Sequence, residues 1–379
     1  MKKVRVAVIG LGFGAEFIPI YQKHPLAECV AVCQRNQEHL DKIADQFGIA
    51  KRYTRYEDVL RDPDIDAVHI NTPPAAHASM SLAGLKAGKH TACTVPMATT
   101  KEECLEIIRC RDKTDKVYMM METVVFSREF LYVKDMLVKG ELGRIQFLRG
   151  SHQQNISMPG WPSYWYGFPP MHYGTHAISP LLTLANAECE SVVCQGSGSI
   201  RPEYAKIYQS PFAIESTLLK LRDSDLACEA TRSLFDTIRQ YRESFDVYGD
   251  KASFEWEQVV KDGMVIFTGL EDARRVHVPD YGHLLPKEIA PFTGGGVYDA
   301  TENVHASFVQ GSGHGGSHPH LCHEFLMAIT EERDSLVDAV RAANWTMAGI
   351  CSHESALAGG KRVELPRVSA QKGLGKPWF

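Results

Sequence analysis

The sequence has no run of about 18 apolar residues, the length that a helix needs to cross a bilayer, so it predicts no membrane span. It has no basic run and a net charge of −5, so nucleic-acid binding has no electrostatic support. The first strand pattern starts at residue 4, which leaves no room for a signal peptide. There is no internal repeat or low-complexity tract. These absences favour a cytoplasmic globular protein.

The ten cysteines form no C-x-x-C pair, which is the spacing typical of zinc sites and dithiol redox motifs. Cys29, Cys33, Cys93 and Cys104 lie in apolar, core-like segments. This pattern predicts reduced thiols in a cytosolic protein and no zinc site. With 379 residues, 44% of them hydrophobic, the chain is long enough for two domains with a large core.

The most informative motif that is present lies at the N-terminus, which reads V-R-V-A-V-I-G-L-G-F-G-A from residue 4. A strand-like run stops at Gly10, Gly12 and Gly14, with Phe13 in the same turn, and an apolar helical segment follows. Glycine lets the backbone approach a pyrophosphate, and the start of a helix offers it N–H groups. Alanine takes the third position of G-x-G-x-x-G, as the fingerprint allows. The turn therefore predicts a dinucleotide site.

The chain divides into two parts by the rhythm of its predicted elements. Up to about residue 122, apolar strands alternate with helices, which predicts a parallel, doubly wound sheet. The predicted strands there are Cys29–Cys33, Ala67–Asn71, His90–Thr94 and Val117–Met121, and the helices are Ala75–Ala87 and Thr100–Thr114. From about residue 145, alternating runs with few helices between them indicate an antiparallel sheet. These runs are Ile145–Ser151, Ser191–Gly196, Ile214–Leu221, Leu226–Thr231, Glu243–Tyr248 and Ser253–Glu257.

The predicted fold class is thus α/β plus α+β. An N-terminal Rossmann domain with a doubly wound parallel sheet covers residues 1–122, and a C-terminal, mostly antiparallel open-sheet domain covers residues 123–379. Two helices, 319–330 and 336–358, are predicted to close the chain, and whether the C-terminal helix packs back on the first domain is left open. The Gly-, Pro- and Ser-rich stretch 279–316 is predicted to be a long surface loop.

The end of the second strand decides which dinucleotide is preferred. Sites for NAD usually carry an Asp or Glu there for the ribose 2′-hydroxyl, but this chain has Gln34, Arg35 and Asn36. The missing carboxylate removes repulsion against a 2′-phosphate, and Arg35 could pair with that phosphate, which favours NADP. In the alternative, Arg35 stacks on the adenine of NAD and Gln34 bonds its ribose. The predicted cofactor is NAD or NADP.

Further residues follow other strands of the predicted Rossmann sheet. The loop N-T-P-P-A-A-H begins at Asn71 and includes Thr72, Pro73 and His77. In an open α/β sheet, ligands lie outside the carboxyl ends of the strands, so this loop is predicted to contact the dinucleotide.

These features resemble the glucose–fructose oxidoreductase/inositol dehydrogenase (Gfo/Idh/MocA) family. The resemblance rests on the N-T-P-x-x-x-H loop, the A-G-K-H lead-in to the next strand and the x-x-P turn after it. It implies a Rossmann domain followed by a mostly antiparallel sheet domain that binds a sugar or polyol, and a homodimer or homotetramer formed through that sheet. Where most of the family has E-K-P, this chain has Thr94, Val95 and Pro96. Valine cannot stabilise an alkoxide or carry a proton, so Val95 is expected to pack near the nicotinamide. Thr94 is likewise predicted to contact the dinucleotide.

A second departure concerns the segment that carries catalytic groups. The common D-x-G-x-H is replaced by H-Y-G-T-H, with His172, Tyr173 and His176. If the segment is helical, the i, i+4 spacing puts the two histidines on one face, with Tyr173 at its rim. Histidine is the natural proton acceptor near neutral pH, which makes His176 the candidate acid/base for a carbinol hydroxyl. The alternative is that His176 only caps or fills a domain interface.

The departures together resemble the branch of the family near glycoside hydrolase family 109. The shared motifs are x-V-P, Y-x-T-H-x-x-x-P, M-M-M-E-T-V-V-F-S-R-E and G-H-G-G. That branch implies retaining glycosidases with tightly held NAD, in which oxidation at sugar C3 acidifies the C2 proton, the C1 substituent is eliminated, water adds and the hydride returns. Sugar 3-dehydrogenases could carry the same motifs.

The favoured prediction is an NAD(P)-dependent oxidoreductase acting on a secondary hydroxyl, possibly C3, of a sugar, polyol or glycoside. The alternatives are a redox-neutral retaining glycosidase with bound NAD and a non-catalytic sugar- or dinucleotide-binding protein. His176 is the predicted acid/base, with Tyr173 and His172 as helpers. No nucleic-acid or membrane partner is expected.

Three further residues are candidates for substrate binding. Trp161 opens an aromatic run that could stack on sugar rings or pack at an interface. Glu122 follows the last predicted Rossmann strand and could bind ligand or pair with Arg128. His314 belongs to a histidine group that continues at 318, 320 and 323. Because 318, 320 and 323 do not share one helical face, no metal site is predicted there, and one or two of these histidines are expected to line the sugar pocket.

Overall fold

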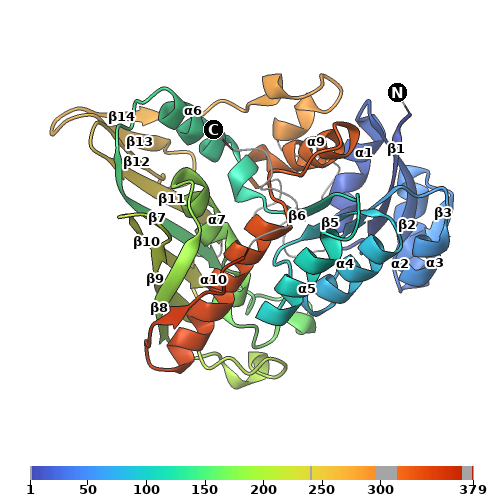
Figure 1. Cartoon of the computed structure of the whole chain (residues 1–379), viewed down its shortest axis with the longest axis horizontal. Helices are drawn as coiled ribbons and strands as arrows, with labels where there is room; N and C mark the ends of the chain where they lie inside the picture. Colours follow the sequence, from blue (N-terminus) through green and yellow to red (C-terminus); the bar gives the residue numbers. More distant parts are fainter. Residues whose placement is uncertain (1, 240, 295–313, 369–377, 379) are drawn as a thin grey trace. The chain divides into compact units, whose positions relative to one another are not determined.

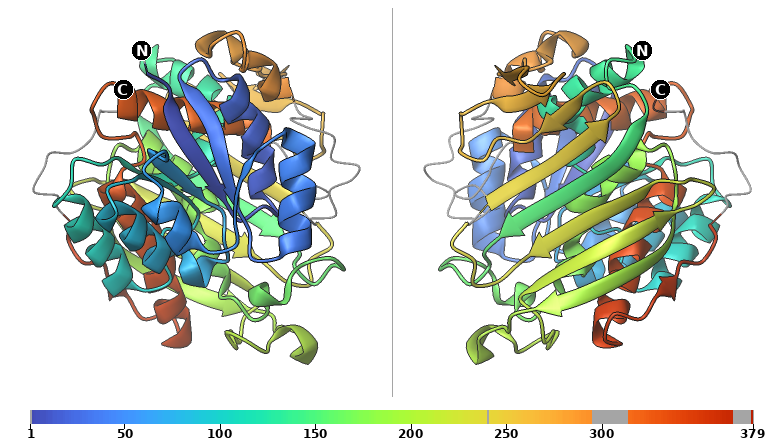
Figure 2. Two further views of the ribbon diagram at one scale, coloured as in Figure 1. Left: turned by 90° about the vertical axis from the view of Figure 1, so that its right-hand side faces the viewer. Right: turned by 90° about the vertical axis from the view of Figure 1, so that its left-hand side faces the viewer.

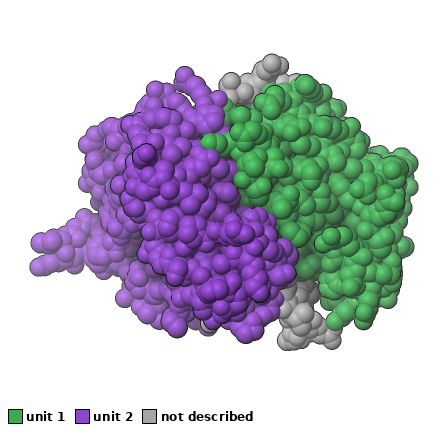
Figure 3. Space-filling model, turned by 90° about the horizontal axis from the view of Figure 1, so that it is seen from below, with its two compact units in different colours: residues 1–122, 281–343, 368–377 green, residues 123–280, 344–367, 378–379 purple. Residues whose placement is uncertain are grey.

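The computed structural model describes residues 2–239, 241–294, 314–368 and 378. Its contacts divide the chain into two compact units, coloured separately in Figure 3. Unit 1 comprises residues 1–122, 281–343 and 368–377, and unit 2 comprises residues 123–280, 344–367 and 378–379. The chain thus changes unit after Glu122, but residues 281–343 group with unit 1 and not with the second domain predicted from the sequence.

Unit 1 is built on a parallel sheet, which has six strands in the described residues (Figure 1). Its strands are β1 Val4–Ile9, β2 Ala27–Cys33, β3 Lys51–Tyr53, β4 Ala67–Ile70, β5 His90–Thr94 and β6 Tyr118–Met121. Their order in the sheet is β3-β2-β1-β4-β5-β6. From β1, the strands β2 and β3 follow on one side of the sheet, and β4, β5 and β6 follow on the other side. This is the doubly wound order, so the predicted Rossmann sheet is confirmed, and the switch point lies where the Gly10 turn follows β1.

Helices flank the sheet of unit 1 in the sequence positions expected for a doubly wound fold. They are α1 Ile18–Lys23, α2 Gln37–Phe47, α3 Tyr56–Arg61, α4 His77–Lys86, α5 Lys101–Arg111 and α9 Ser317–Thr330. Thr100 and Glu103 form a capping box at the start of α5, each accepting a backbone N–H of the other. In the described ranges, no helix has the length and hydropathy required to cross a membrane.

Unit 2 is built on a mixed sheet, which has nine strands in the described part of the chain. Their order is β14-β13-β12-β11-β7-β10-β9-β8-β15. The strands are β7 Ile145–Gln154, β8 Cys189–Ser197, β9 Ile214–Leu221, β10 Ala227–Ser233, β11 Tyr241–Gly249, β12 Ser253–Glu255, β13 Met264–Phe267, β14 Ala273–Val276 and β15 Val363–Glu364. All neighbouring pairs run antiparallel except β7 and β10, which run parallel. The predicted mostly antiparallel sheet is confirmed (Figure 2).

Helix α7 (Thr175–Leu184) packs on the central strands β7, β10 and β11 of this sheet. Gly150 of β7 makes the close approach possible, because a Cβ there would lie 2.0 Å from the carbonyl oxygen of Ala177 in α7. The other helices here are α6 Arg128–Val138 and α10 Ala339–Leu357, the second of which begins in unit 1 and continues into unit 2. The glycine therefore sets the depth at which α7 carries its side chains onto the sheet.

The segment 279–316 differs from the predicted surface loop. Its described part contains 3₁₀ turns at Gly282–Leu284, Ala290–Gly294 and His314–Gly316. Tyr281 and Ile289 are buried in it. The Gly-, Pro- and Ser-rich composition predicted a surface loop, but it did not reveal that the described turns bury apolar side chains. Residues 295–313 of this predicted loop lie outside the described residues.

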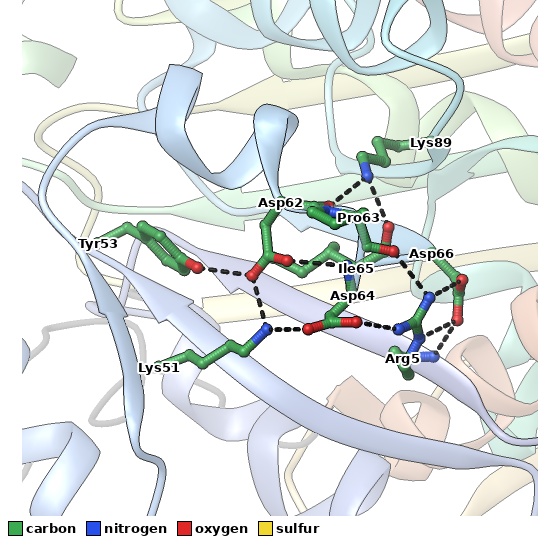
Figure 4. A network of polar contacts seen from close by, with 9 residues as sticks. All are labelled: Arg5, Lys51, Tyr53, Asp62, Pro63, Asp64, Ile65, Asp66 and Lys89. Atoms are coloured by element: carbon green, nitrogen blue, oxygen red, sulfur yellow. Dashed lines mark hydrogen bonds and ion pairs between the residues drawn. The ribbon is translucent and has the colours of Figure 1, made fainter.

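A network of polar contacts joins residues of β1 and β3 to the segment between α3 and β4 (Figure 4). The buried Lys89 ammonium donates to the backbone carbonyls of Asp62 and Ile65, at 2.8 and 2.7 Å. Arg5 donates twice to the carboxylate of Asp66, at 2.9 and 2.8 Å. These charged groups satisfy one another and the turn between α3 and β4, so we assign the network to stability and not to ligand binding.

Candidate functional site

The glycine turn after β1 lies against the end of β4. Gly10 has φ +84°, and a Cβ there would lie 2.5 Å from the carbonyl oxygen of Asn71. At Gly14 a Cβ would lie 3.0 Å from the Asn71 side chain. The turn passes from Gly12 and Phe13 into a 3₁₀ turn at Gly14–Phe17, followed by α1. A side chain at either glycine would push the turn away from β4, so the sequence supplies the close approach that a dinucleotide turn needs.

Asn71 gives this turn a polar lining. Its amide nitrogen donates to the His69 carbonyl at 3.2 Å, whereas its Oδ1 is buried and has no hydrogen-bond partner among the described residues. A buried acceptor without a donor is costly, and a ribose or amide donor of a dinucleotide would satisfy it. The glycine turn and the Asn71 oxygen thus fit the cofactor that the sequence predicts.

His77 joins two loops at this edge of the sheet. Its Nδ1 lies 2.7 Å from the carbonyl oxygen of Pro96, and its Nε2 lies 2.7 Å from that of Thr72. Burial lowers the pKa of this imidazole, although both backbone contacts act in the opposite direction. Thr94 donates its hydroxyl to the carbonyl of Ile70 at 3.2 Å. His77 and Thr94 therefore hold the loops in place, and their predicted contacts with the dinucleotide stay predictions.

The turn that contains Val95 departs from the family pattern, but it keeps a defined shape. Val95 is 7% exposed and forms a cis peptide bond with Pro96. Pro73 precedes the 3₁₀ turn Pro74–Ala76 that leads into α4. The two proline-containing turns follow β5 and β4, the neighbouring parallel strands whose carboxyl ends meet at one edge of the sheet.

The end of β2 is open to a ligand. Arg35 is exposed, and its backbone N–H donates to the side-chain oxygen of Gln34 at 3.2 Å. Asn36 caps α2 by accepting the N–H of His39 at 2.8 Å. The imidazole of His39 contacts the carbonyl oxygen of Leu11 in the glycine turn at 3.3 Å. Arg35 is thus exposed directly after β2, and its predicted role in reading the ribose stays a prediction.

His314 lies in unit 1 and contacts the glycine turn. Its ring is 5.9 Å from that of Phe13 and 5.3 Å from that of His318, which faces the carboxylate of Glu16 at 3.3 Å. His323 instead contacts His24 at 3.0 Å. The histidines of this segment therefore diverge. In the described residues they do not form a group with metal-ligand spacing, and the expected role of His314 in sugar binding stays a prediction.

Four ionisable side chains lie in one row on the buried face of the unit 2 sheet. Across β9, β10, β7 and β11, register pairs Glu215 with Arg232, Arg232 with His152, and His152 with Glu243. All four residues are buried. Burying charged groups costs free energy unless they are paired and hydrogen-bonded, so this row is a candidate for the functional site.

Helix α7 brings His176 onto this row. His176 is 2% exposed, and its Nδ1 lies 3.3 Å from the Thr123 hydroxyl and 3.8 Å from Oε1 of Glu243. Its ring meets that of His152 at 4.8 Å and that of Tyr173 at 5.3 Å, both edge to face. The predicted pair of His176 and Tyr173 is thus brought together by the fold.

Tyr173 lies against a buried cation. The guanidinium carbon of Arg232 is 5.0 Å from the centre of the Tyr173 ring, and its Nε donates to the Tyr173 carbonyl at 2.9 Å. Arg232 also donates to the carbonyl of His152 and to the side chain of Gln154, at 3.1 and 2.8 Å. Burial lowers the pKa of this guanidinium to about 10, so it remains a cation near neutral pH. The contact between this cation and the ring is a cation–π interaction.

His172 does not join this group, which corrects the predicted shared helical face. Residues 170–173 form a 3₁₀ turn, and α7 begins only at Thr175 after Gly174. The Met171 N–H donates to the Glu215 carboxylate at 2.7 Å, which fixes the turn. The His172 ring instead lies 5.2 Å from that of His353, and burial lowers its pKa to about 3. With this low pKa the imidazole of His172 is neutral near neutral pH, and its predicted role as a helper of His176 stays a prediction.

The other predicted substrate residues lie apart from one another. Trp161 is 8% exposed and meets Trp165 edge to face at 6.1 Å, and Trp165 in turn lies 4.9 Å from Tyr173. The predicted aromatic run is therefore continuous with the Tyr173 side of the site. Glu122 is fully buried directly after β6, in unit 1.

Sequence reasoning missed His152, Arg232 and Glu243. The three side chains point to the buried face of their strands, where the alternation of apolar residues would otherwise place aliphatic side chains. The polar residues at these otherwise apolar positions are visible in the sequence, but only the strand order shows that the three residues are neighbours. His152, His176 and Glu243 also have ligand atoms within 4.8 Å of one another, the one such group found in the described residues, although no metal site was predicted.

Comparison with known proteins agrees with this architecture. Residues 4–122 match the model of the Gfo/Idh/MocA family, described as an oxidoreductase family with an NAD-binding Rossmann fold. A glycosyl hydrolase family 109 protein from Shewanella baltica is 34% identical over 206 residues, which is 49% of this chain and 45% of that protein. An α-N-acetylgalactosaminidase from Shewanella oneidensis is 33% identical with the same coverage. The match thus spans about half the length of these curated relatives.

Solved structures share the fold over nearly the whole chain. Levoglucosan dehydrogenase in complex with NADH and levoglucosan superposes with a TM-score of 0.77 at 22% identity, covering 97% of this chain and 100% of that one. An oxidoreductase from Agrobacterium radiobacter in complex with NAD⁺, L-tartaric acid and magnesium gives 0.77 at 15% identity, covering 96% and 98%. The predicted resemblance to the Gfo/Idh/MocA family and to its family 109 branch is confirmed, and the part of the chain that matches the NAD-binding family model is the part predicted to hold the dinucleotide.

Proposed function

We propose that this chain, whose Rossmann domain is of the NAD-binding Gfo/Idh/MocA oxidoreductase type, oxidises a secondary hydroxyl of a sugar, polyol or glycoside, at C3 in the case of a sugar. The observation that carries the proposal is the buried group in unit 2, in which His176 and Tyr173 lie beside the Arg232 cation. A base and a cation in one desolvated group suit the removal of a proton from an alcohol and the stabilisation of the resulting oxygen charge.

The dinucleotide is proposed to be held by the turn from Gly10 to Gly14, with Asn71 supplying its buried oxygen. A bound nicotinamide supplies the acceptor for the hydride. Because the family description and both structural neighbours name NAD, we propose NAD as the cofactor. The exposed Arg35 remains the residue that could admit NADP, and comparing the affinities of the two dinucleotides for wild type and Arg35→Ala tests this point.

The chain's own part in the reaction is proton transfer and charge stabilisation. His176 takes the proton of the substrate hydroxyl as the C–H bond breaks, since imidazole is a base near neutral pH. Tyr173, with Arg232 over its ring, donates a hydrogen bond to the same oxygen or relays its proton. The aromatic side chains of Trp165 and Trp161 extend from the Tyr173 side and are suited to pack on the C–H face of a sugar ring.

The first experiment identifies what the purified protein carries. After denaturation, the supernatant is examined for nicotinamide dinucleotide by mass and absorbance. Sugars, polyols and glycosides are then screened for NAD(P)H formation. His176→Ala and Tyr173→Phe are expected to lower kcat by about 100-fold or more without weakening dinucleotide binding. Full activity of the His176→Ala variant would refute the assignment of the acid/base.

A redox-neutral retaining glycosidase is the second candidate, because the curated relatives carry glycosidase names. The same C3 oxidation would then acidify C2, release the C1 substituent and end with return of the hydride. The two functions differ in whether turnover consumes added dinucleotide. Near-stoichiometric NAD(H) that survives purification, together with release of the aglycone from an aryl glycoside without added NAD, would establish the glycosidase.

Assembly and location complete the proposal. We propose a homodimer or homotetramer that forms through the open face of the unit 2 sheet, where the neighbouring Val193 and Leu218 are 39% and 55% exposed (Figure 2). Light scattering with Leu218→Glu against wild type tests this, since a monomeric wild type would refute it. All ten cysteines are thiols and not disulfides in the structure, and all ten lie in the described ranges, which supports the cytoplasm as the location.

A further inference from the structure

Glu243 is a buried carboxylate that the mechanism above does not use. It lies on β11, 8% exposed, and its Oε1 accepts a hydrogen bond from the Tyr241 hydroxyl at 2.6 Å. The same oxygen is 3.8 Å from Nδ1 of His176. Thus one carboxylate oxygen is anchored by a phenol on its own strand and faces an imidazole carried by helix α7.

The anchoring of this carboxylate is rigid. Residues 241 and 243 are two apart on one strand, so their side chains share a face of the sheet, and the register pairs Glu243 with His152 on β7. Burial and the neighbouring carboxylate raise the pKa of Tyr241 well above its usual range. Tyr241 therefore keeps its proton near neutral pH and can donate it to Glu243.

The imidazole is held so that its two nitrogens have different surroundings. Nδ1 lies 3.3 Å from the Thr123 hydroxyl and faces Glu243. A carboxylate on the Nδ1 side favours the tautomer that carries its proton there, which leaves Nε2 as the basic nitrogen. It also stabilises the imidazolium that forms when Nε2 is protonated.

We propose that Glu243, anchored by Tyr241, is the positioning residue of His176: it holds the proton on Nδ1, directs Nε2 to the substrate hydroxyl and offsets the positive charge of the protonated ring. This inference rests on the proposed function, because it assigns a partner to the same acid/base. It adds two residues, Tyr241 and Glu243, that the sequence analysis did not identify.

The proposed step balances. The substrate loses its carbinol hydrogen with the electron pair of the C–H bond to the oxidised nicotinamide. The hydroxyl proton passes to Nε2 of His176, and the O–H electron pair forms the second bond of the carbonyl. The proton on Nδ1 stays in place, so Glu243 remains a carboxylate throughout and undergoes no chemical change.

Other ionisable groups also act on His176 and must be held constant in a test. His152 and Tyr173 contact its ring, and Arg232 lies over Tyr173. Glu129, at the start of α6, adds a repulsive effect on Glu243 when it is charged. Of these groups, only Glu243 is a carboxylate within 4 Å of a His176 nitrogen in the described structure. The substitution Glu243→Gln removes its negative charge and leaves the volume of the side chain nearly unchanged.

The test measures His176 directly as well as turnover. In the ¹⁵N-histidine-labelled full chain, His176 is assigned by comparison with His176→Gln, and its tautomer and pKa are followed by NMR. We expect Glu243→Gln to lower the pKa of His176 by about one pH unit and to weaken the preference for a proton on Nδ1. Tyr241→Phe removes the anchor but keeps the charge, so the pKa of His176 should remain at or above its wild-type value. Glu229→Gln, on β10 and paired with the exposed Arg149, is the matched control and should change nothing.

In the activity arm, Glu243→Gln should lower kcat at least tenfold, leave KM within about threefold and move the acidic limb of the kcat profile to lower pH. An unchanged tautomer and pKa in Glu243→Gln would overturn the inference. So would a stoichiometric metal ion in the purified wild type that Glu243→Gln loses, because Glu243 and His176 would then be ligands. If the wild type turns over no sugar but its His176 responds as expected, the proposed function fails while the pairing of the two residues stands.

Discussion

The strongest test of the dinucleotide site is the substitution Gly10→Ala. Gly10 combines a φ of +84° with a close approach, since its Cβ would lie 2.5 Å from the carbonyl oxygen of Asn71. Gly48 at the end of α2 has φ +66° and nothing within 4 Å of its Cβ position. The two positions therefore separate backbone strain from steric conflict.

The structure supplies the expected magnitudes. A residue with a side chain in the left-handed region costs about 1–2 kcal/mol, and both variants incur this cost. In Gly10→Ala the backbone of Asn71 must also move, which in a well-packed region costs about 1–3 kcal/mol more. We expect Gly48→Ala to lose about 1–2 kcal/mol of unfolding free energy and Gly10→Ala to lose about 2–5 kcal/mol.

Dinucleotide binding provides the second measurement. The free Gly10→Ala protein relieves the conflict by moving the turn away from β4, and binding must restore the turn. We therefore expect the Kd for NAD to rise at least tenfold, or about 1.4 kcal/mol, whereas Gly48→Ala should leave it unchanged. Urea unfolding followed by circular dichroism and isothermal titration calorimetry with NAD measure the two effects. Equal stability losses in both variants, or an unchanged Kd in Gly10→Ala, would refute the reasoning.

Three other predictions concern buried groups. Burial raises the pKa of Glu129 from 4.5 to about 7, so the folded state binds its proton more tightly, and stability is full below pH 4.5 and falls as the pH rises from 4.5 to about 7. Glu129→Gln should therefore be more stable than wild type at about pH 8, by up to about 3 kcal/mol, and similar at about pH 4, as urea unfolding at both values will reveal. A thiol reagent should modify at most Cys110 rapidly, because the other nine cysteines are buried, and rapid modification of several thiols in the native protein would contradict the structure. Lys89→Met leaves two backbone carbonyls without their charged donor and should cost about 3 kcal/mol of unfolding free energy, compared with nearly none for the exposed Lys86→Met.

The dinucleotide turn was predictable because its physics is local. Gly10 needs its positive φ and Gly14 its lack of a Cβ, and both requirements are visible in the sequence as a strand, a glycine turn and a helix. The loops after β4 and β5 were found in the same way, because the carboxyl ends of parallel strands meet at one edge of the sheet. The sequence predicted that His77 belongs to the loop after β4 and contacts the dinucleotide. In the structure both of its ring nitrogens contact backbone carbonyls of the chain itself.

The residues of the proposed acid/base group were predicted only in part. Tyr173 and His176 are three residues apart and come together as expected. His172 was placed with them on the assumption of one continuous helix, and this was wrong, because a 3₁₀ turn held by Glu215 precedes Gly174 and rotates His172 towards His353. Spacing alone cannot show where a helix starts when the turn before it is held by a residue from a distant strand.

By itself, the sequence determined what depends on neighbouring residues: the strand–helix alternation, the alternating strands of the second half, the glycine turn and the identity of His176 as the candidate base. Tertiary structure alone decided which side chains surround that base. The row of Arg232, His152 and Glu243 exists because β7 lies between β10 and β11 with one register, and because Gly150 lets α7 descend onto those strands. Register and strand order are set by the packing of the whole sheet, so residues about 90 positions apart become neighbours only when the chain is folded.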